Sequence, residues 1–189
     1  MKRTFIAIDI PVNNTVKGLL NKLNHKLRNE RIKWVEPEQY HITLQFLGNI
    51  DESLIDTIIP GLDKIAGNIS GFSIILKEFG VFKNLKNPRI LWIGFAPCKE
   101  LEMLKYAIDE EMLKLGFEKS DKPFSAHLTI GRIKQLKDTQ ILKEWIDEHR
   151  EAELQEIEVN EIIFYESILK SYGPEYIAIK RHSLRHAGN

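Results

Sequence analysis

Residues 40–48, YHITLQFLG, alternate polar and apolar side chains as a half-buried strand does. Strand geometry puts His41 and Thr43 on one face and apolar residues on the other. The pattern recurs at residues 126–132, AHLTIGR. The chain therefore carries two strands that each place a histidine and a threonine opposite an apolar face.

Two copies of this pattern are not expected by chance. Random placement of 6 histidines and 6 threonines among 189 residues gives about 0.2 His-x-Thr triplets. One copy alone is best explained by a core histidine that hydrogen-bonds its neighbouring threonine. A core gives no reason to repeat the same polar pair, so the two copies together indicate a site.

The segments around the motifs alternate between strand and helix patterns. Asn13 or Asn14 is expected to cap the first helix, and Pro60 is expected to kink or split the second. We expect strands at 3–11, 72–82, 89–95, 124–133, 152–169 and 176–181, a strand–turn–strand unit over 32–48, and helices at 13–29, 51–68, 98–117 and 139–150.

Two rounds of strand, helix and strand, each with one motif, predict an internal duplication. The two motif histidines are 86 residues apart, which suits one motif in each of two lobes. No stretch rich in proline, glycine or serine separates the halves. We therefore expect residues 1–189 to form a single bilobal domain with no separable linker.

The composition is that of an ordinary globular chain, with 43% hydrophobic and 29% charged residues. The formal net charge is zero, because Lys plus Arg and Asp plus Glu both total 27. A neutral chain is not expected to bind long stretches of phosphate backbone, but a local cluster of cations can still bind one terminal phosphate. Cys98 is the only cysteine, so no intrachain disulfide is possible. With no long apolar run or signal peptide pattern, we expect a cytoplasmic monomer without a membrane partner.

The two motifs together describe a site for displacement at phosphorus. Imidazole titrates near about pH 6.5, so one histidine of a pair can accept a proton while the other donates one. Thr43 and Thr129, two residues after His41 and His127, add hydroxyl donors on the same faces. On opposite sides of a cleft, such a pair deprotonates the attacker and protonates the leaving oxygen. Spacing does not decide which histidine is the acid.

The motifs HITL and HLTI resemble the signature of the two-histidine phosphoesterase superfamily. More of the chain resembles one branch, the RNA 2′,3′-cyclic phosphodiesterases once described as 2′-5′ RNA ligases. The resemblance spans nearly the whole chain. In order, the similar segments are RTFIAIDIP (3–11), KWVEPEQYHITLQFLG (33–48), FGVFKNLKNPRILWIGF (79–95), FSAHLTIGRIK (124–134) and FYESILKSYGPEYIAI (164–179).

This resemblance implies an α+β fold with two similar lobes, each an antiparallel sheet with outer helices, around a central cleft that carries both motifs. It implies hydrolysis of 2′,3′-cyclic phosphate RNA ends, tRNA fragments among them, to 2′-phosphomonoesters without metal or other cofactor. ATP-independent 2′-5′ ligation is the implied reverse reaction. The family order makes His41 the proton donor and His127 the proton acceptor.

Arg132 ends the second motif and resembles an arginine that often closes it in this branch. Strict alternation puts Arg132 on the face opposite His127, where it would form a surface ion pair. A bulge or bend at Gly131 would redirect it toward a phosphate or ribose. Both interpretations stay open, beside the phosphate-binding role expected of Thr43 and Thr129.

Other residues have a structural interpretation as well as a functional one. Phe46, Tyr40 and Trp34 are expected in the core rather than in a nucleobase pocket. Exposed turn cations that contact RNA or only solvent are expected at Lys83, Lys86 and Arg89, and a disordered tail rather than a metal pair is expected at His182 and His186.

Two other functions fit the same residues. The site would act on a small cyclic nucleotide if the pocket were closed, or the cleft would bind nucleotides or RNA ends without catalysis. Several enzyme classes lack their motifs here: there is no G-x-x-x-x-G-K-[ST], no G-x-G-x-x-G, no H-E-x-x-H and no G-x-S-x-G.

Overall fold

The computed structural model describes residues 1–119, 123–171 and 173–186. Its strands are β1 (Lys2–Asp9), β2 (Arg31–Trp34), β3 (His41–Ile50), β4 (Phe72–Phe82), β5 (Ile90–Phe95), β6 (His127–Gln135), β7 (Glu153–Val159), β8 (Glu161–Lys170) and β9 (Gly173–Ser183). Its helices are α1 (Asn14–Lys26), α2 (Ile55–Asn68), α3 (Lys99–Lys114) and α4 (Thr139–Glu148), with single 3₁₀ turns at Pro37–Gln39 and Glu52–Leu54.

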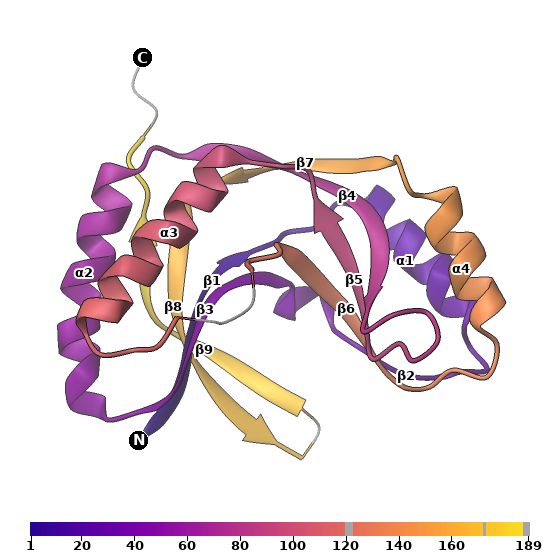
Figure 1. Ribbon diagram of the computed structural model, residues 1–189, viewed down its shortest axis with the longest axis horizontal. Coiled ribbons are helices and arrows are strands. Elements are labelled where there is room, and N and C mark those ends of the chain that lie inside the picture. The colour runs from indigo at the N-terminus through magenta and orange to yellow at the C-terminus, as the bar shows by residue number, and fades with distance from the viewer. Residues whose placement is uncertain (120–122, 172, 187–189) are drawn as a thin grey trace.

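The strands form two antiparallel sheets, in the orders β3-β1-β8-β9 and β2-β6-β5-β4-β7. Helices α2 and α3 contact the first sheet, and α1 and α4 contact the second, so each sheet has two outer helices (Figure 1). We name the first sheet with its helices lobe one and the second lobe two. The expected α+β fold with two such lobes is confirmed.

Neither lobe is a continuous half of the chain. Helix α1 follows β1 of lobe one but packs in lobe two, and α3 follows β5 of lobe two but packs in lobe one. Strands β4 and β5 lie in lobe two although β3 and α2 before them lie in lobe one. The chain thus passes between the lobes repeatedly.

Two expected elements differ in the structure. The single strand expected over 152–169 is wrong, because the chain breaks at Asn160 and its two parts join different sheets. Both parts carry apolar residues, so periodicity alone gives no break. The expected split at Pro60 is also wrong, since α2 continues through it with its apolar face buried. The N-cap is Asn13, whose side chain accepts a hydrogen bond from the Val16 backbone nitrogen.

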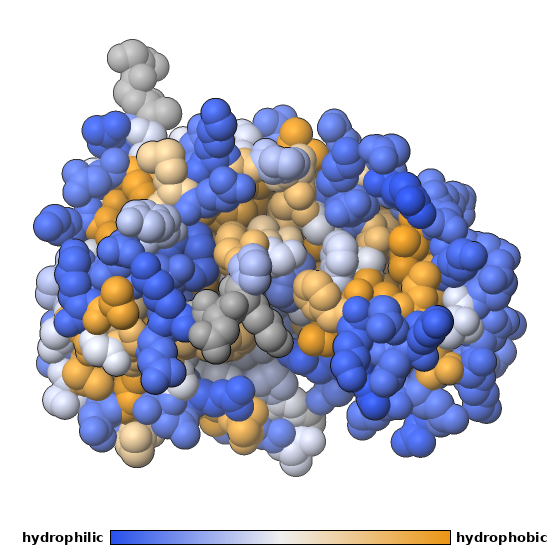
Figure 2. Space-filling view, viewed as in Figure 1, coloured by the Kyte–Doolittle hydropathy of each residue, from blue (hydrophilic) through white to orange (hydrophobic). Residues whose placement is uncertain are grey.

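The core accounts for the position of the motif strands. Leu44 of β3 and Ile130 of β6 are buried in one large apolar cluster that spans both lobes. The faces opposite this cluster carry the histidines and threonines, which are half-buried. Figure 2 shows one face of the molecule, which is largely hydrophilic, with apolar side chains between the lobes and also in patches on each lobe.

Candidate active site

Both motif histidines are held in the same way. His41 begins β3 and His127 begins β6. Nδ1 of His41 lies 2.7 Å from the Gln39 carbonyl oxygen, and Nδ1 of His127 lies 2.8 Å from the Ser125 carbonyl oxygen. Because a carbonyl only accepts, each Nδ1 carries the proton and each Nε2 is left as the reactive nitrogen.

Aromatic rings fix the two imidazoles further. The ring of Tyr176 meets His41 edge-on, with centroids 5.1 Å apart and planes at 86°. The ring of Phe82 meets His127 in the same manner, at 4.8 Å and 89°. Each lobe thus orients its histidine with one backbone carbonyl and one perpendicular ring.

A bulge interrupts β3 directly after its threonine. Thr43 pairs with β1, the next paired residue is Gln45, and Leu44 is the extra residue. Leu44 and Gln45 are therefore both buried, and Phe46 returns to the face that carries the histidine. The expected core position of Phe46 is wrong, since its side chain is 68% exposed.

Strand β6 has the same bulge at the same place. Thr129 pairs with Trp92 of β5, the next paired residue is Gly131, and Ile130 is the extra residue. Ile130 and Gly131 are both buried, and Arg132 is exposed. This bulge, at Ile130 directly before Gly131, places Arg132 on the face opposite to the one that strict alternation predicts. The fifth residue after each histidine therefore lies on the histidine's own face.

The two histidines share one electrostatic environment, because β3 and β6 contact each other across the lobes. Burial lowers the pKa of His41, and the positive charges of His127 and Arg132 act in the same direction. The Gln39 carbonyl and the Asp9 carboxylate oppose that shift. Burial raises the pKa of Tyr176, and the positive charge of Arg132 opposes that shift, so the charge of Arg132 acts on a residue of lobe one.

Thr43 and Thr129 lie where the sequence pattern predicts them, half-buried on the faces of the histidines. Within the described part of the chain, neither hydroxyl has a hydrogen-bond partner. The two hydroxyl donors thus lie on the same strand faces as the two imidazoles, on β3 and β6.

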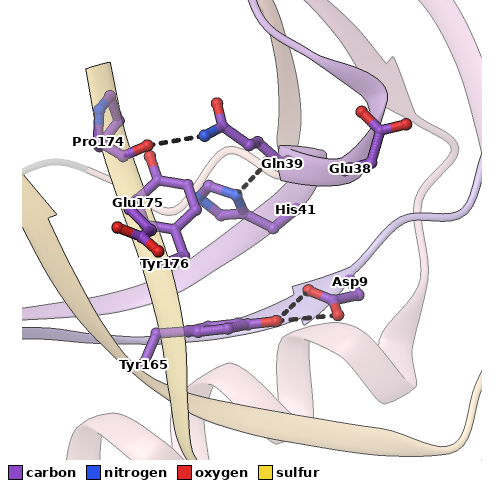
Figure 3. Close-up of a pocket in the computed structure, with 8 residues that line it drawn as sticks. All are labelled: Asp9, Glu38, Gln39, His41, Tyr165, Pro174, Glu175 and Tyr176. Carbon is purple, nitrogen blue, oxygen red and sulfur yellow. Dashed lines mark hydrogen bonds between the residues drawn. The ribbon is translucent and has the colours of Figure 1, made fainter. Parts of the chain in front are cut away.

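A pocket of about 260 Å³ opens beside His41 (Figure 3). The Tyr165 hydroxyl donates to both carboxylate oxygens of Asp9, at 2.7 and 2.9 Å. Asp9 lies opposite His41 in the pairing of β1 with β3, so this carboxylate stands beside the imidazole. The lining residues are Asp9, Glu38, Gln39, His41, Tyr165, Pro174, Glu175 and Tyr176.

Sequence patterns leave Asp9 and Tyr165 without a role. The alternation of β1 was the available signal for Asp9, because Phe5 and Ala7 precede it on the face away from the main core. Tyr165 comes from β8, and only the strand order places it beside β1. The pair is the main part of the site that the motifs do not predict.

Several minor expectations are also decided by the structure. His182 does not belong to a disordered tail, because it is buried and its Nδ1 lies 2.8 Å from Asp63 of α2. Tyr40 is buried and Trp34 packs against the core, as expected.

Among the described residues, no group of three or more His, Cys, Asp or Glu side chains is placed to hold a metal ion, and no helix there is long and apolar enough to cross a membrane.

The model of the LigT-like phosphoesterase family matches the chain twice, at residues 8–92 and 93–176. This chain belongs to the LigT-like phosphoesterase family. The first match contains His41 and the second contains His127, so the predicted internal duplication is confirmed. The predicted membership of the two-histidine phosphoesterases is confirmed with it.

Relatives in this LigT-like family align over most of the chain. The RNA 2′,3′-cyclic phosphodiesterase of Methanocaldococcus jannaschii is 38% identical over 178 residues, which cover 94% of this chain and 98% of that protein. The protein of the same name from Aquifex aeolicus is 39% identical over 154 residues, which cover 80% of this chain and 81% of that protein.

Solved structures share the fold of this LigT-like chain. The protein TT0787 of Thermus thermophilus has a TM-score of 0.79 at 26% identity, covering 98% of this chain and 100% of its own. The Escherichia coli LigT complexed with 3′-AMP has a TM-score of 0.72 at 22% identity, covering 97% and 98%.

Proposed function

We propose that this LigT-like protein is an RNA 2′,3′-cyclic phosphodiesterase that converts cyclic phosphate ends to 2′-phosphomonoesters. The observation that carries the proposal is the matched pair of imidazoles, each with Nδ1 bonded to a carbonyl and Nε2 free, on contacting strands of opposite lobes. The names of the bacterial and archaeal relatives support the same substrate.

In this mechanism the two histidines act on opposite sides of one phosphorus atom. Nε2 of His127 accepts a proton from water as the water oxygen attacks phosphorus. The bond from phosphorus to the 3′ oxygen breaks, and Nε2 of His41 gives that oxygen its proton. Thr43 and Thr129 donate to the non-bridging oxygens, and Arg132 neutralises their charge. The products are a 2′-phosphate and a 3′-hydroxyl.

The position of Asp9 supports the assignment of His41 as the acid. A general acid must hold a proton before the reaction, and the Asp9 carboxylate stabilises the protonated form of His41. Tyr165 holds that carboxylate in place by donating to both of its oxygens. Burial still lowers the pKa of His41 overall, and Asp9 acts against that shift.

We further propose that the substrate is an RNA end, tRNA fragments included, rather than a free cyclic nucleotide. Lys83, Lys86 and Arg89 are exposed on the turn between β4 and β5, next to Phe82 and His127, and form no ion pair within the described residues. These cations would contact the backbone of a longer RNA.

The reverse reaction, attack by a 5′-hydroxyl instead of water, gives ATP-independent 2′-5′ ligation. We propose a cytoplasmic monomer, residues 1–189 acting as one domain.

Incubation of a short RNA that ends in a 2′,3′-cyclic phosphate, with EDTA present, tests the proposal. We expect conversion to the 2′-phosphate, separated by chromatography from the 3′-phosphate, and a lower KM than for the cyclic mononucleotide. A tightly bound but unconverted RNA would show a noncatalytic binding module. Faster turnover of the mononucleotide would show a small-molecule phosphodiesterase.

Replacing Asp9 should change the pH dependence of the reaction. Asp9→Asn keeps an oxygen that accepts from Tyr165 but removes the charge that favours protonated His41. The pKa of His41 should fall, so the alkaline limb of the kcat/KM profile should move to lower pH. Tyr165→Phe keeps the charge and should not produce that displacement. An unmoved limb in Asp9→Asn would contradict the assigned role.

A further inference from the structure

An aromatic surface lies on lobe two beside the motif threonine. Trp92 of β5 pairs with Thr129 of β6, and its neighbours Leu91 and Ile93 are fully buried in the main core. Trp92 therefore projects from the opposite face of the sheet, the face that carries Thr129, and it is only half-buried there.

The indole of Trp92 lies directly on the backbone of two glycines. A Cβ atom at Gly80, the residue of β4 that pairs with Trp92, would lie 2.2 Å from Cζ2 of the indole. A Cβ atom at Gly94 would lie 3.1 Å from Cζ3. Any side chain at Gly80 would displace the indole, so the glycine is what allows the ring of Trp92 to lie flat against the backbone of β4.

Phe82 extends this surface to the catalytic histidine. Its ring centroid lies 5.3 Å from that of Trp92, with planes at 38°, and 4.8 Å from that of His127. Neither Phe82 nor Trp92 belongs to the two buried apolar clusters of the described residues. The rings of Phe82 and Trp92 thus form a continuous aromatic surface from His127 to the side of Thr129.

We propose that the indole of Trp92 stacks on the base of the nucleotide that carries the cyclic phosphate. This inference rests on the proposed function and adds a binding site for the terminal base. A phosphate between the two threonines puts its own nucleoside within reach of Trp92, because Trp92 and Thr129 are cross-strand neighbours. Stacking uses the face of a base, which every base has, so this site accepts all four bases.

Two RNAs of the same length test the inference, one with a complete terminal nucleotide and one whose terminal nucleotide has hydrogen in place of the base. Both carry the 2′,3′-cyclic phosphate. Since stacking on one aromatic ring gives about 5- to 150-fold, wild type should have at least a fivefold higher kcat/KM for the complete end. Trp92→Leu should reduce this ratio to nearly one, and Trp92→Phe should keep most of it.

Gly80→Ala provides a second variant that leaves the tryptophan in the chain. The added methyl group displaces the indole, so this variant should lose the preference as Trp92→Leu does, and it carries the test if Trp92→Leu does not fold. An unchanged ratio in both variants would overturn the inference. Loss of the ratio in Phe46→Leu but not in Trp92→Leu would overturn it too, by moving the base to lobe one.

The experiment separates this inference from the proposed function. If wild type converts neither RNA, the proposed function fails. If wild type converts both at equal kcat/KM, the chemistry stands and the stacking site fails. A third RNA, lacking only the base before the terminal nucleotide, checks the position. If Trp92→Leu changes the response to that RNA alone, the assignment to the terminal base is wrong.

Discussion

Replacing His41 or His127 with alanine should lower the turnover of a cyclic phosphate end by about 10²–10⁴-fold. Each substitution removes one proton transfer. In the proposed mechanism each side of the phosphorus has one imidazole, so no second imidazole replaces the one that is lost. The two losses should not add, because acid and base act in one step, so the double variant should be nearly as active as the worse single variant. Single-turnover rates on the RNA substrate measure all three.

The pH profiles of these variants separate the roles of the two histidines. An acid must be protonated, so activity that depends on His41 is lost as the pH rises through its pKa. A base must be neutral, so activity that depends on His127 is lost as the pH falls. His41→Ala should therefore lose the alkaline limb and His127→Ala the acidic limb. The opposite pairing would reverse the proposed order, and full turnover in either variant would place the active site elsewhere.

The alternation of two short strands predicted the main elements of this site. It put His41 and His127 with their threonines on one face of each strand, and the structure shows them there. Alternation failed at the fifth residue after each histidine. One extra residue in each strand reverses the alternation, so Phe46 and Arg132 lie on the faces of the histidines. A bulge has no apolar signature, and only Gly131 indicated one.

Contacts between segments that are distant in the sequence could not be predicted from alternation, for a different reason. Asp9 and Tyr165 meet because β1 lies between β3 and β8, and strand order depends on long-range pairing. The break at Asn160 was missed because apolar residues continue on both sides of it while the chain changes lobes. His182 looked like part of a polar tail, and only the approach of Asp63 from α2 explains its burial.

The same bulge gives the two lobes different chemistry. On lobe one the exposed residue is the aromatic ring of Phe46, and on lobe two it is the guanidinium of Arg132. Duplication supplied two equivalent strands, each with an imidazole and a hydroxyl. The fifth positions then differ, so that a cation lies on the strand that carries His127. In the proposed mechanism, lobe two would neutralise the phosphate and lobe one would protonate its leaving oxygen.

Thr43→Val and Thr129→Val should each lower kcat by about 10²–10³-fold, the loss typical when one donor to a developing oxyanion is removed. Valine keeps the shape of threonine, so the strand and its bulge should stay intact while the hydroxyl donor is lost. Thr43→Ser and Thr129→Ser keep the donor and should retain most of the activity. Steady-state kinetics with the cyclic phosphate RNA measures the four variants.

Thr4→Val is the matched control for these substitutions. Thr4 lies on β1 of lobe one, it is 1% exposed, and its hydroxyl has no hydrogen-bond partner among the described residues. Removing a buried hydroxyl without a partner should leave stability equal or higher and turnover unchanged. If Thr43→Val and Thr129→Val behave like Thr4→Val, the two hydroxyls do not bind the phosphate. A loss of kcat in the motif variants alone, with unfolding midpoints equal to that of wild type, would assign both donors to the reacting phosphoryl group.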